Sequence, residues 1–117
     1  MTIALLITGV LTAGAVIVAI APAPALKLLF GAERIDALLW LIARHWGLLV
    51  SLVGGLLIYA AYHPDVRAPV MIVGIAEKLA IGALIFGSRF RTKPGAAIVA
   101  TADTMMAVAY IVLLARP

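Results

Sequence analysis

Four long apolar runs divide this chain of 117 residues and restrict what it can fold into. Each run is close to the roughly 20 residues that a membrane-spanning helix needs. The chain is 66% hydrophobic and 12% charged, whereas a soluble domain is about half apolar and about a quarter charged. The sequence therefore predicts an all-α polytopic membrane protein, one domain over residues 1–117 that forms a four-transmembrane-helix bundle. The expected helices cover residues 3–21, 35–62, 69–87 and 96–115.

The connections between the runs differ in character. Pro22 and Pro24 end the first run, because proline lacks a backbone donor and restricts the residue before it. Residues 25–33 are too apolar for a free loop, so we expect a short interfacial helical segment there. Residues 63–66 form a turn so short that the second and third helices must be antiparallel neighbours.

The basic residues indicate an orientation. More Lys and Arg residues lie in the first and third connections than on the opposite side, and the positive-inside rule then places those connections in the cytoplasm. Both termini are predicted outside, in a multi-pass protein of the cell inner membrane. The cytoplasmic set is Lys27, Arg34, Arg89, Arg91 and Lys93, and the opposite set is Arg67 and Arg116.

Charged side chains interrupt two of the apolar runs. Glu77 and Lys78 lie near the middle of the third run, and Asp103 lies in the fourth. Charges inside membrane segments are rare, usually face other helices or a wet cavity, and suggest function by default. At about 1.5 Å per residue, Glu77 lies about 15 Å and Asp103 about 12 Å from the basic end. The two carboxyl groups are therefore predicted at nearly the same depth.

Arg44 and His45 lie close to the same end and complete a predicted ligand-binding or ion-pair cluster of Arg44, His45, Glu77, Lys78 and Asp103. Adjacent helical residues do not face one another. We therefore expect Glu77 in the bundle interior, and Lys78 at a subunit contact or a second acid. Arg44 either anchors its helix at the interface or pairs with one of the acids. Three alternative roles are open for Glu77. It belongs to a structural ion pair, it forms a ligand or proton site, or it is a protonated carboxyl group hydrogen-bonded to a neighbouring helix.

Small residues predict where helices approach one another closely. On the second helix, Gly47, Ser51 and Gly55 follow one another at helical spacing. On the first helix, Gly9, Ala13 and Gly14 provide a similar face. We expect a neighbouring helix to pack against each of these stripes.

Several classes of site are excluded or disfavoured by the residues present. The chain has no cysteine, which rules out disulfides, thiol redox relays and thiolate metal sites. His45 and His63 are predicted near opposite surfaces, so we expect no metal or haem site within one chain. The sequence has no phosphate-binding loop, nucleophile elbow or metal-binding histidine pair. We expect no nucleic-acid binding, and an enzyme, the least favoured interpretation, would have to use the buried Glu, Lys, Asp and His set.

The chain from Leu29 to Phe90 resembles small four-helix membrane proteins of the DoxX-like and BphX-like kind, through the segments LFGAER, RHWGLLVSLVGGLLIYA, HPDVRAP and the following EK. Such families are largely uncharacterised, and some members occur alongside oxidoreductases or catabolic enzymes. The resemblance implies an accessory or quinone-linked membrane role. Small multidrug transporters are similar in length and helix number, but their defining acid lies in the first helix, where residues 3–21 carry no charge.

We therefore expect a non-enzymatic membrane component that binds a lipophilic small molecule, lipid or quinone, or a partner membrane subunit, through the predicted cluster. The alternative is a proton-coupled transporter of small lipophilic cations. Four short helices with small-residue faces bury little on their own. For that reason we also expect a homo-oligomer, or an accessory subunit of a membrane complex, surrounded by membrane lipids.

Overall fold

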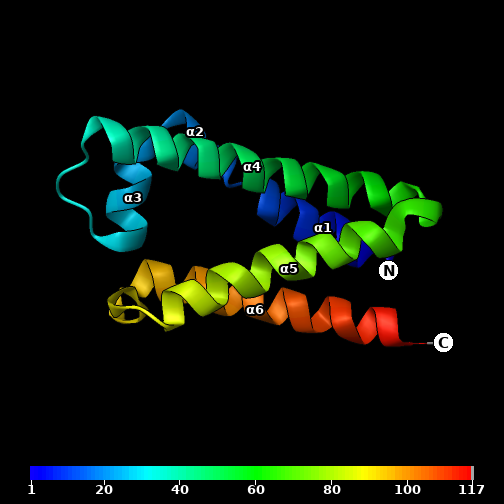
Figure 1. Ribbon diagram of the computed structural model, residues 1–117. Coiled ribbons are helices and arrows are strands. Elements are labelled where there is room, and N and C mark those ends of the chain that lie inside the picture. Colours follow the sequence, from blue (N-terminus) through cyan, green and yellow to red (C-terminus); the bar gives the residue numbers. More distant parts are fainter. Residues whose placement is uncertain (117) are drawn as a thin grey trace.

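The computed structural model describes residues 1–116, which are almost entirely helical and contain no strand (Figure 1). The all-α prediction is confirmed. Four stretches are long and apolar enough to cross a membrane. They lie along one another in a bundle that measures 48 × 25 × 19 Å. The stretches are Thr2–Ile20, Ala37–Tyr62, Pro64–Phe86 and Pro94–Ala115.

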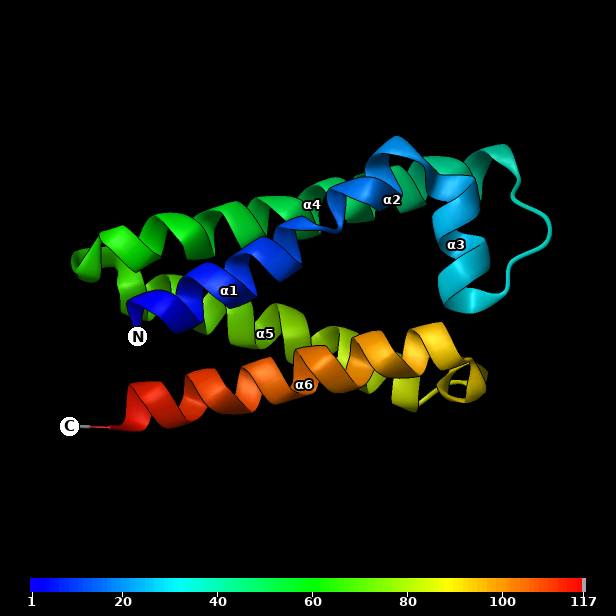
Figure 2. The same ribbon diagram turned by 180° about the vertical axis from the view of Figure 1, so that it is seen from behind.

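The first of these stretches is interrupted, although a single helix was expected. α1 (Thr2–Ala13) and α2 (Val16–Ile20) are separated by Gly14 and Ala15. At the junction the Ala15 amide donates to the carbonyl of Thr12, three residues back rather than four. Such 3₁₀-type bonds tighten a helix and interrupt its regular side-chain spacing. Figure 2 shows the narrow link between α1 and α2 about midway along the bundle.

α3 (Pro22–Phe30) runs across one end of the bundle and contacts α2, α4 and α6 (Figures 1 and 2). Pro22 occupies the first turn, where its missing N–H is not needed. Gly31 ends the helix with a left-handed φ of 68°, the conformation that favours glycine at a helix C-terminus. The segment expected at residues 25–33 is thus helical, and it begins and ends earlier than predicted.

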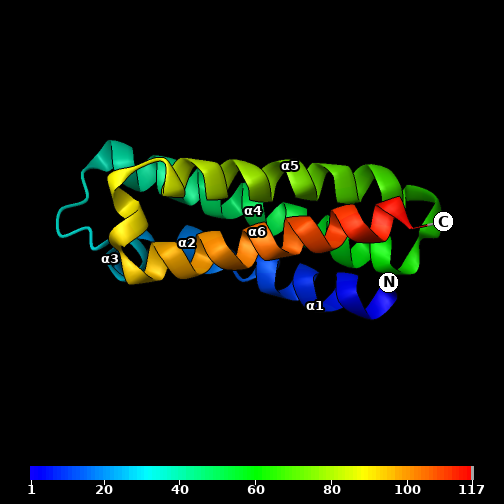
Figure 3. The same ribbon diagram turned by 90° about the horizontal axis from the view of Figure 1, so that it is seen from below.

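The remaining helices form two antiparallel pairs. α1 and α2 pack on α4, α5 packs on α6, and contacts between α4 and α5 join the pairs (Figures 1 and 3). α4 has 26 residues, a length of about 39 Å that exceeds the roughly 30 Å hydrocarbon core of a bilayer. The bounds are α4 (Ala37–Tyr62), η1 (Pro64–Val66), α5 (Arg67–Phe86), η2 (Arg89–Thr92) and α6 (Pro94–Ala115).

The two ends of the bundle differ in packing. The start of α1 and the end of α6 lie at the same end as the α4–α5 connection, whereas α3 and η2 lie at the opposite, basic end (Figures 1 and 3). The largest apolar core lies toward the end with the termini. Its members come from α1, α4, α5 and α6 and are Leu5, Leu57, Ala60, Ala61, Met71 and Tyr110.

Glycines allow α1 and α2 to approach α4 closely. A Cβ on Gly54 would lie 2.7 Å from the Cα of Ala13, and one on Gly47 would lie 2.8 Å from the carbonyl oxygen of Ala15. By contrast, nothing lies within 4 Å of a Cβ on Gly55. The predicted contact at Gly55 is therefore wrong. Residues seven apart return to nearly the same helical face, whereas residues eight apart are rotated by about 80°. Gly54, seven residues after Gly47, therefore shares its face and contacts α1, whereas Gly55 does not.

The Gly54→Ala substitution should destabilise the bundle, because the added methyl group meets backbone atoms that cannot move independently. We expect a loss of about 1–3 kcal/mol, typical of overpacking. The matched control is Gly55→Ala, which adds the same methyl group to open space and should leave stability unchanged or raise it. Thermal unfolding in detergent measures both, and equal melting temperatures for the two variants would contradict this packing.

Candidate functional site

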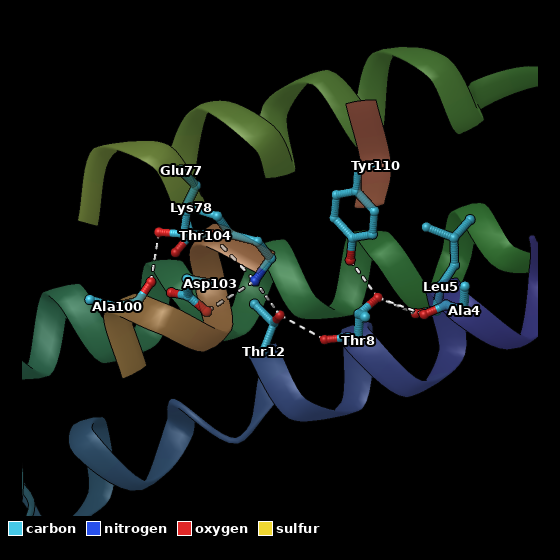
Figure 4. A network of polar contacts seen from close by, with 10 residues as sticks. All are labelled: Ala4, Leu5, Thr8, Thr12, Glu77, Lys78, Ala100, Asp103, Thr104 and Tyr110. Carbon is cyan, nitrogen blue, oxygen red and sulfur yellow. Dashed lines mark hydrogen bonds and ion pairs between the residues drawn. The ribbon is translucent and has the colours of Figure 1, made fainter. Parts of the chain in front are cut away.

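Lys78 on α5 is the most deeply buried charge in the described chain. Its side chain is 0% exposed. The Nζ atom lies 3.5 Å from Oδ1 of Asp103 on α6 and 3.7 Å from Oε2 of Glu77, and it donates a 2.7 Å hydrogen bond to Oγ1 of Thr12 on α1 (Figure 4). We call Thr12, Glu77, Lys78 and Asp103 the polar cluster. One ammonium group thus links three helices.

The placement of Lys78 corrects one expectation. Glu77 and Lys78 were expected to belong to separate sites, yet the Lys78 ammonium approaches both Glu77 and Asp103. Of the two roles expected for Lys78, contact with a second acid is the one that the structure shows. A lysine carries its charge on a flexible four-carbon stem, so the angle between neighbouring residues on the helix does not decide where that charge lies. Because both carboxyl groups reach one nitrogen, they lie at the same depth, as predicted.

The polar cluster holds two carboxyl groups and only one cation. The side chains of Glu77 and Asp103 are 18% and 17% exposed. Oε2 of Glu77 is buried and has no hydrogen-bond partner within residues 1–116, because its 3.7 Å separation from Lys78 is too long for one. A buried acceptor without a donor is costly. The cluster is therefore suited to take up a proton, a hydrogen-bond donor or a second cation.

A chain of hydrogen bonds leads from the polar cluster along α1. Thr12 Oγ1 donates 2.7 Å to the carbonyl of Thr8, and the Tyr110 hydroxyl of α6 donates to Thr8 Oγ1 (Figure 4). Thr8 Oγ1 in turn donates 2.7 Å to the carbonyl of Ala4. Bonds of this kind satisfy threonine hydroxyls inside an apolar helix. One face of α1 therefore provides polar partners to both α5 and α6.

The two threonines were missed in the sequence, although a signal was present. Thr8 and Thr12 are four residues apart in a run that carries no charge. That spacing places both hydroxyls on one helical face, and a pair of polar groups facing the same way in an apolar helix indicates a polar neighbour. Asp103 and Tyr110 are seven residues apart, a spacing that likewise places both on one face of α6.

The structure does not bring Arg44 and His45 to the polar cluster. Both side chains are exposed on α4. Arg44 Nε donates 3.0 Å to the carbonyl of Ala19, and its guanidinium lies 4.6 Å from the centroid of the Trp40 ring. This arrangement agrees with the interfacial-anchor alternative for Arg44. Two ion pairs occur among residues 1–116, and both belong to Lys78.

No group of three His, Asp or Glu side chains within residues 1–116 is arranged to hold a metal ion. A cavity of about 390 Å³ adjoins the polar cluster. Thr12, Glu77 and Asp103 form its polar side, and Gly14 and Ala15 at the α1–α2 junction line it as well. The volume is within the range of about 300–1,000 Å³ found for small-molecule pockets. The rest of the lining is mostly apolar and includes Leu11, Ile17, Leu29, Trp46, Val50 and Val99.

No family model, curated protein or solved structure matches this chain. The resemblance to DoxX-like and BphX-like proteins stays a prediction. The basis for a function is therefore the cavity and the polar cluster beside it.

Removing the buried cation tests whether the polar cluster holds the helices together. Lys78→Met leaves two carboxyl groups facing each other without a counter-ion, and breaking a buried pair in this way costs about 3–5 kcal/mol. Arg44→Met removes the same charge from an exposed position and should cost under about 1 kcal/mol. Thermal unfolding in detergent compares the two variants. If Lys78→Met is no less stable than Arg44→Met, the polar cluster is not what stabilises the bundle.

Proposed function

We propose that the chain inserts into the inner membrane through four spanning helices and binds a lipophilic small molecule, such as a lipid or quinone, in the cavity beside the polar cluster. The observation that carries this proposal is a mostly apolar cavity of about 390 Å³ with two carboxyl groups, those of Glu77 and Asp103, on one side. The protein acts as a binding component without a catalytic step of its own.

Insertion is supported by the outward-facing side chains. Large apolar residues are exposed on all the long helices, for example Ile3 at 72%, Leu84 at 71% and Ile98 at 69%. A soluble monomer rarely exposes contiguous apolar surface of that extent, whereas hydrocarbon solvates it. Trp40 near the basic end and Tyr62 near the other are also exposed, as aromatic belts at the two membrane interfaces require. The excess of basic residues supports an orientation with the α3 and η2 end in the cytoplasm and both termini outside.

The cavity favours a ligand with two chemical features. Its apolar walls suit a hydrocarbon body, because burying apolar surface is favourable wherever it is removed from water. The Glu77 and Asp103 carboxyl groups in the cavity wall suit a hydrogen-bond donor on that ligand. Quinol hydroxyls and the hydroxyl groups of lipids combine an apolar body with such a donor, so both belong to the proposed ligand class.

The expected partner, a second copy of the chain or a membrane complex, stays a prediction. The exposed apolar faces that suit lipid would equally suit another transmembrane helix. In a membrane, close association needs small residues or interhelical hydrogen bonds rather than apolar surface alone. Gly55, with open space around it, provides one such small position on the outer face of α4.

A second candidate function is proton-coupled transport of small lipophilic cations. Two observations favour it: the carboxyl groups outnumber the cations in the polar cluster, and α1 and α2 form a discontinuous helix beside the cavity. Transporters often place substrate sites near the middle of the membrane at interrupted helices. In this function a proton and a cationic substrate alternate at Glu77.

Filling the cavity tests the binding function. Val99→Trp introduces an indole into the cavity wall and should abolish copurification of a lipophilic molecule, measured by mass spectrometry of solvent extracts of the purified protein. Val108→Trp is the matched control, because Val108 is on the same helix but is 53% exposed. It should retain the molecule. Empty extracts from both the unaltered chain and the control would contradict the binding function.

Neutralising Glu77 tests the transport function. Glu77→Gln keeps the shape of the side chain but cannot exchange a proton, so it should abolish proton-driven uptake of tetraphenylphosphonium into liposomes. Glu33→Gln removes an equal charge from the exposed loop before α4 and should transport normally. Uptake that is unchanged in Glu77→Gln, or absent in the unaltered chain, would eliminate transport of this probe.

A further inference from the structure

A second cavity, of about 680 Å³, opens at the basic end of the bundle. It lies between the end of α3, the start of α4 and η2, and it shares no lining residue with the cavity beside the polar cluster. We call it the basic pocket. Its lining combines polar and cationic residues with an apolar floor: Arg89, Thr92 and Lys93 with Leu26, Phe30, Leu39 and Phe90.

The basic pocket carries an uncompensated positive charge. Arg89 and Lys93 are both exposed, and no acidic residue lines the pocket. Neither side chain takes part in an ion pair within residues 1–116, where both ion pairs belong to Lys78. Two cations that face one cavity repel each other unless an anion lies between them. The pocket is therefore complementary to an anionic group.

The two cations lie close to the apolar floor. Lys93 Nζ lies 3.4 Å from the place where a Cβ on Gly31 would be, so the side chain lies back over the C-terminal end of α3. The Arg89 guanidinium lies 5.3 Å from the centroid of the Phe90 ring, within range of a cation–π contact. Phe90 itself meets Phe30 edge to face, with ring centroids 5.5 Å apart. The charges and the apolar surface thus belong to one preformed site.

We propose that the basic pocket binds the headgroup phosphate of an anionic phospholipid. A guanidinium and an ammonium group both bind phosphate oxygens, and basic pockets at the cytoplasmic ends of transmembrane helices recognise anionic headgroups. The apolar floor gives the first part of the acyl chains a surface that a free anion would not need. This assignment depends on membrane insertion with the basic end at the headgroup level, but it does not depend on the ligand cavity beside the polar cluster.

Lipid titration of the full-length chain tests the proposal. Native mass spectrometry of the detergent-solubilised protein measures its affinity for added phosphatidylglycerol and for phosphatidylcholine. The unaltered chain should prefer phosphatidylglycerol. Arg89→Gln/Lys93→Gln should weaken phosphatidylglycerol binding about thirtyfold, since each cation that contacts the headgroup phosphate contributes a factor of about five. The matched control is Lys27→Gln/Arg34→Gln, which removes the same charge from the same end outside the pocket and should bind nearly as well as the unaltered chain.

Three results would overturn the assignment. Equal losses in the two double variants would show that diffuse surface charge attracts the lipid, and unchanged binding in Arg89→Gln/Lys93→Gln would exclude the pocket. Competition by soluble glycerol phosphate at concentrations equal to the lipid would assign the pocket to a free anion. Circular dichroism verifies that each variant is folded, and if the double variant is not, Arg89→Gln alone should weaken binding about fivefold. The titration measures only binding of the added phospholipid. A negative result would therefore reject the basic pocket without bearing on the ligand cavity beside the polar cluster.

Discussion

The burial of the Lys78 ammonium is the constraint on which the rest of the bundle depends. An isolated charge in an apolar interior is unfavourable by several kcal/mol or more, so its partners must be present wherever the helix places it. Those partners come from α1 and α6 as well as from α5 itself. The register of three helices is therefore linked to one nitrogen atom, and sliding any of them along its axis would separate the charge from its partners.

The bundle has its largest apolar core toward one end and both proposed binding cavities toward the other. Beyond the polar cluster toward the termini, Leu5, Leu57 and Met71 form a closed apolar core with Tyr110. Toward the basic end, α1 gives way to α2 at Gly14 and Ala15, and α3 turns across the bundle. Gly14 and Ala15, at this junction, line the cavity beside Glu77 and Asp103. Both proposed binding sites belong to this less densely packed half, and they differ in the sign of their charge.

Sequence reasoning located the charged residues of the site but misjudged how one of them is oriented. Hydropathy and helical rise were sufficient to place Glu77 and Asp103 at one depth, because depth depends only on the number of residues along a helix. Lys78 was expected at a subunit contact or a second acid, in a site separate from that of Glu77, because rotation around a helix was taken to decide the direction of a long, flexible side chain. Arg44 was left with two roles, and its contacts with the Ala19 carbonyl and the Trp40 ring agree with the interfacial anchor.

By itself, the sequence determined that the chain is all-helical, has four helices long and apolar enough to cross a membrane, and carries its basic connections at one end. These properties follow from the length of each apolar segment and from the positions of Lys and Arg along the chain, and neither depends on which helices become neighbours. Only the tertiary structure decided that Thr12 completes the polar cluster, that Gly54 rather than Gly55 meets α1, and that both proposed binding cavities open in the basic half. Each of these depends on which helices become neighbours and at what rotation, and a pattern of apolar residues on every side of a helix does not specify that rotation.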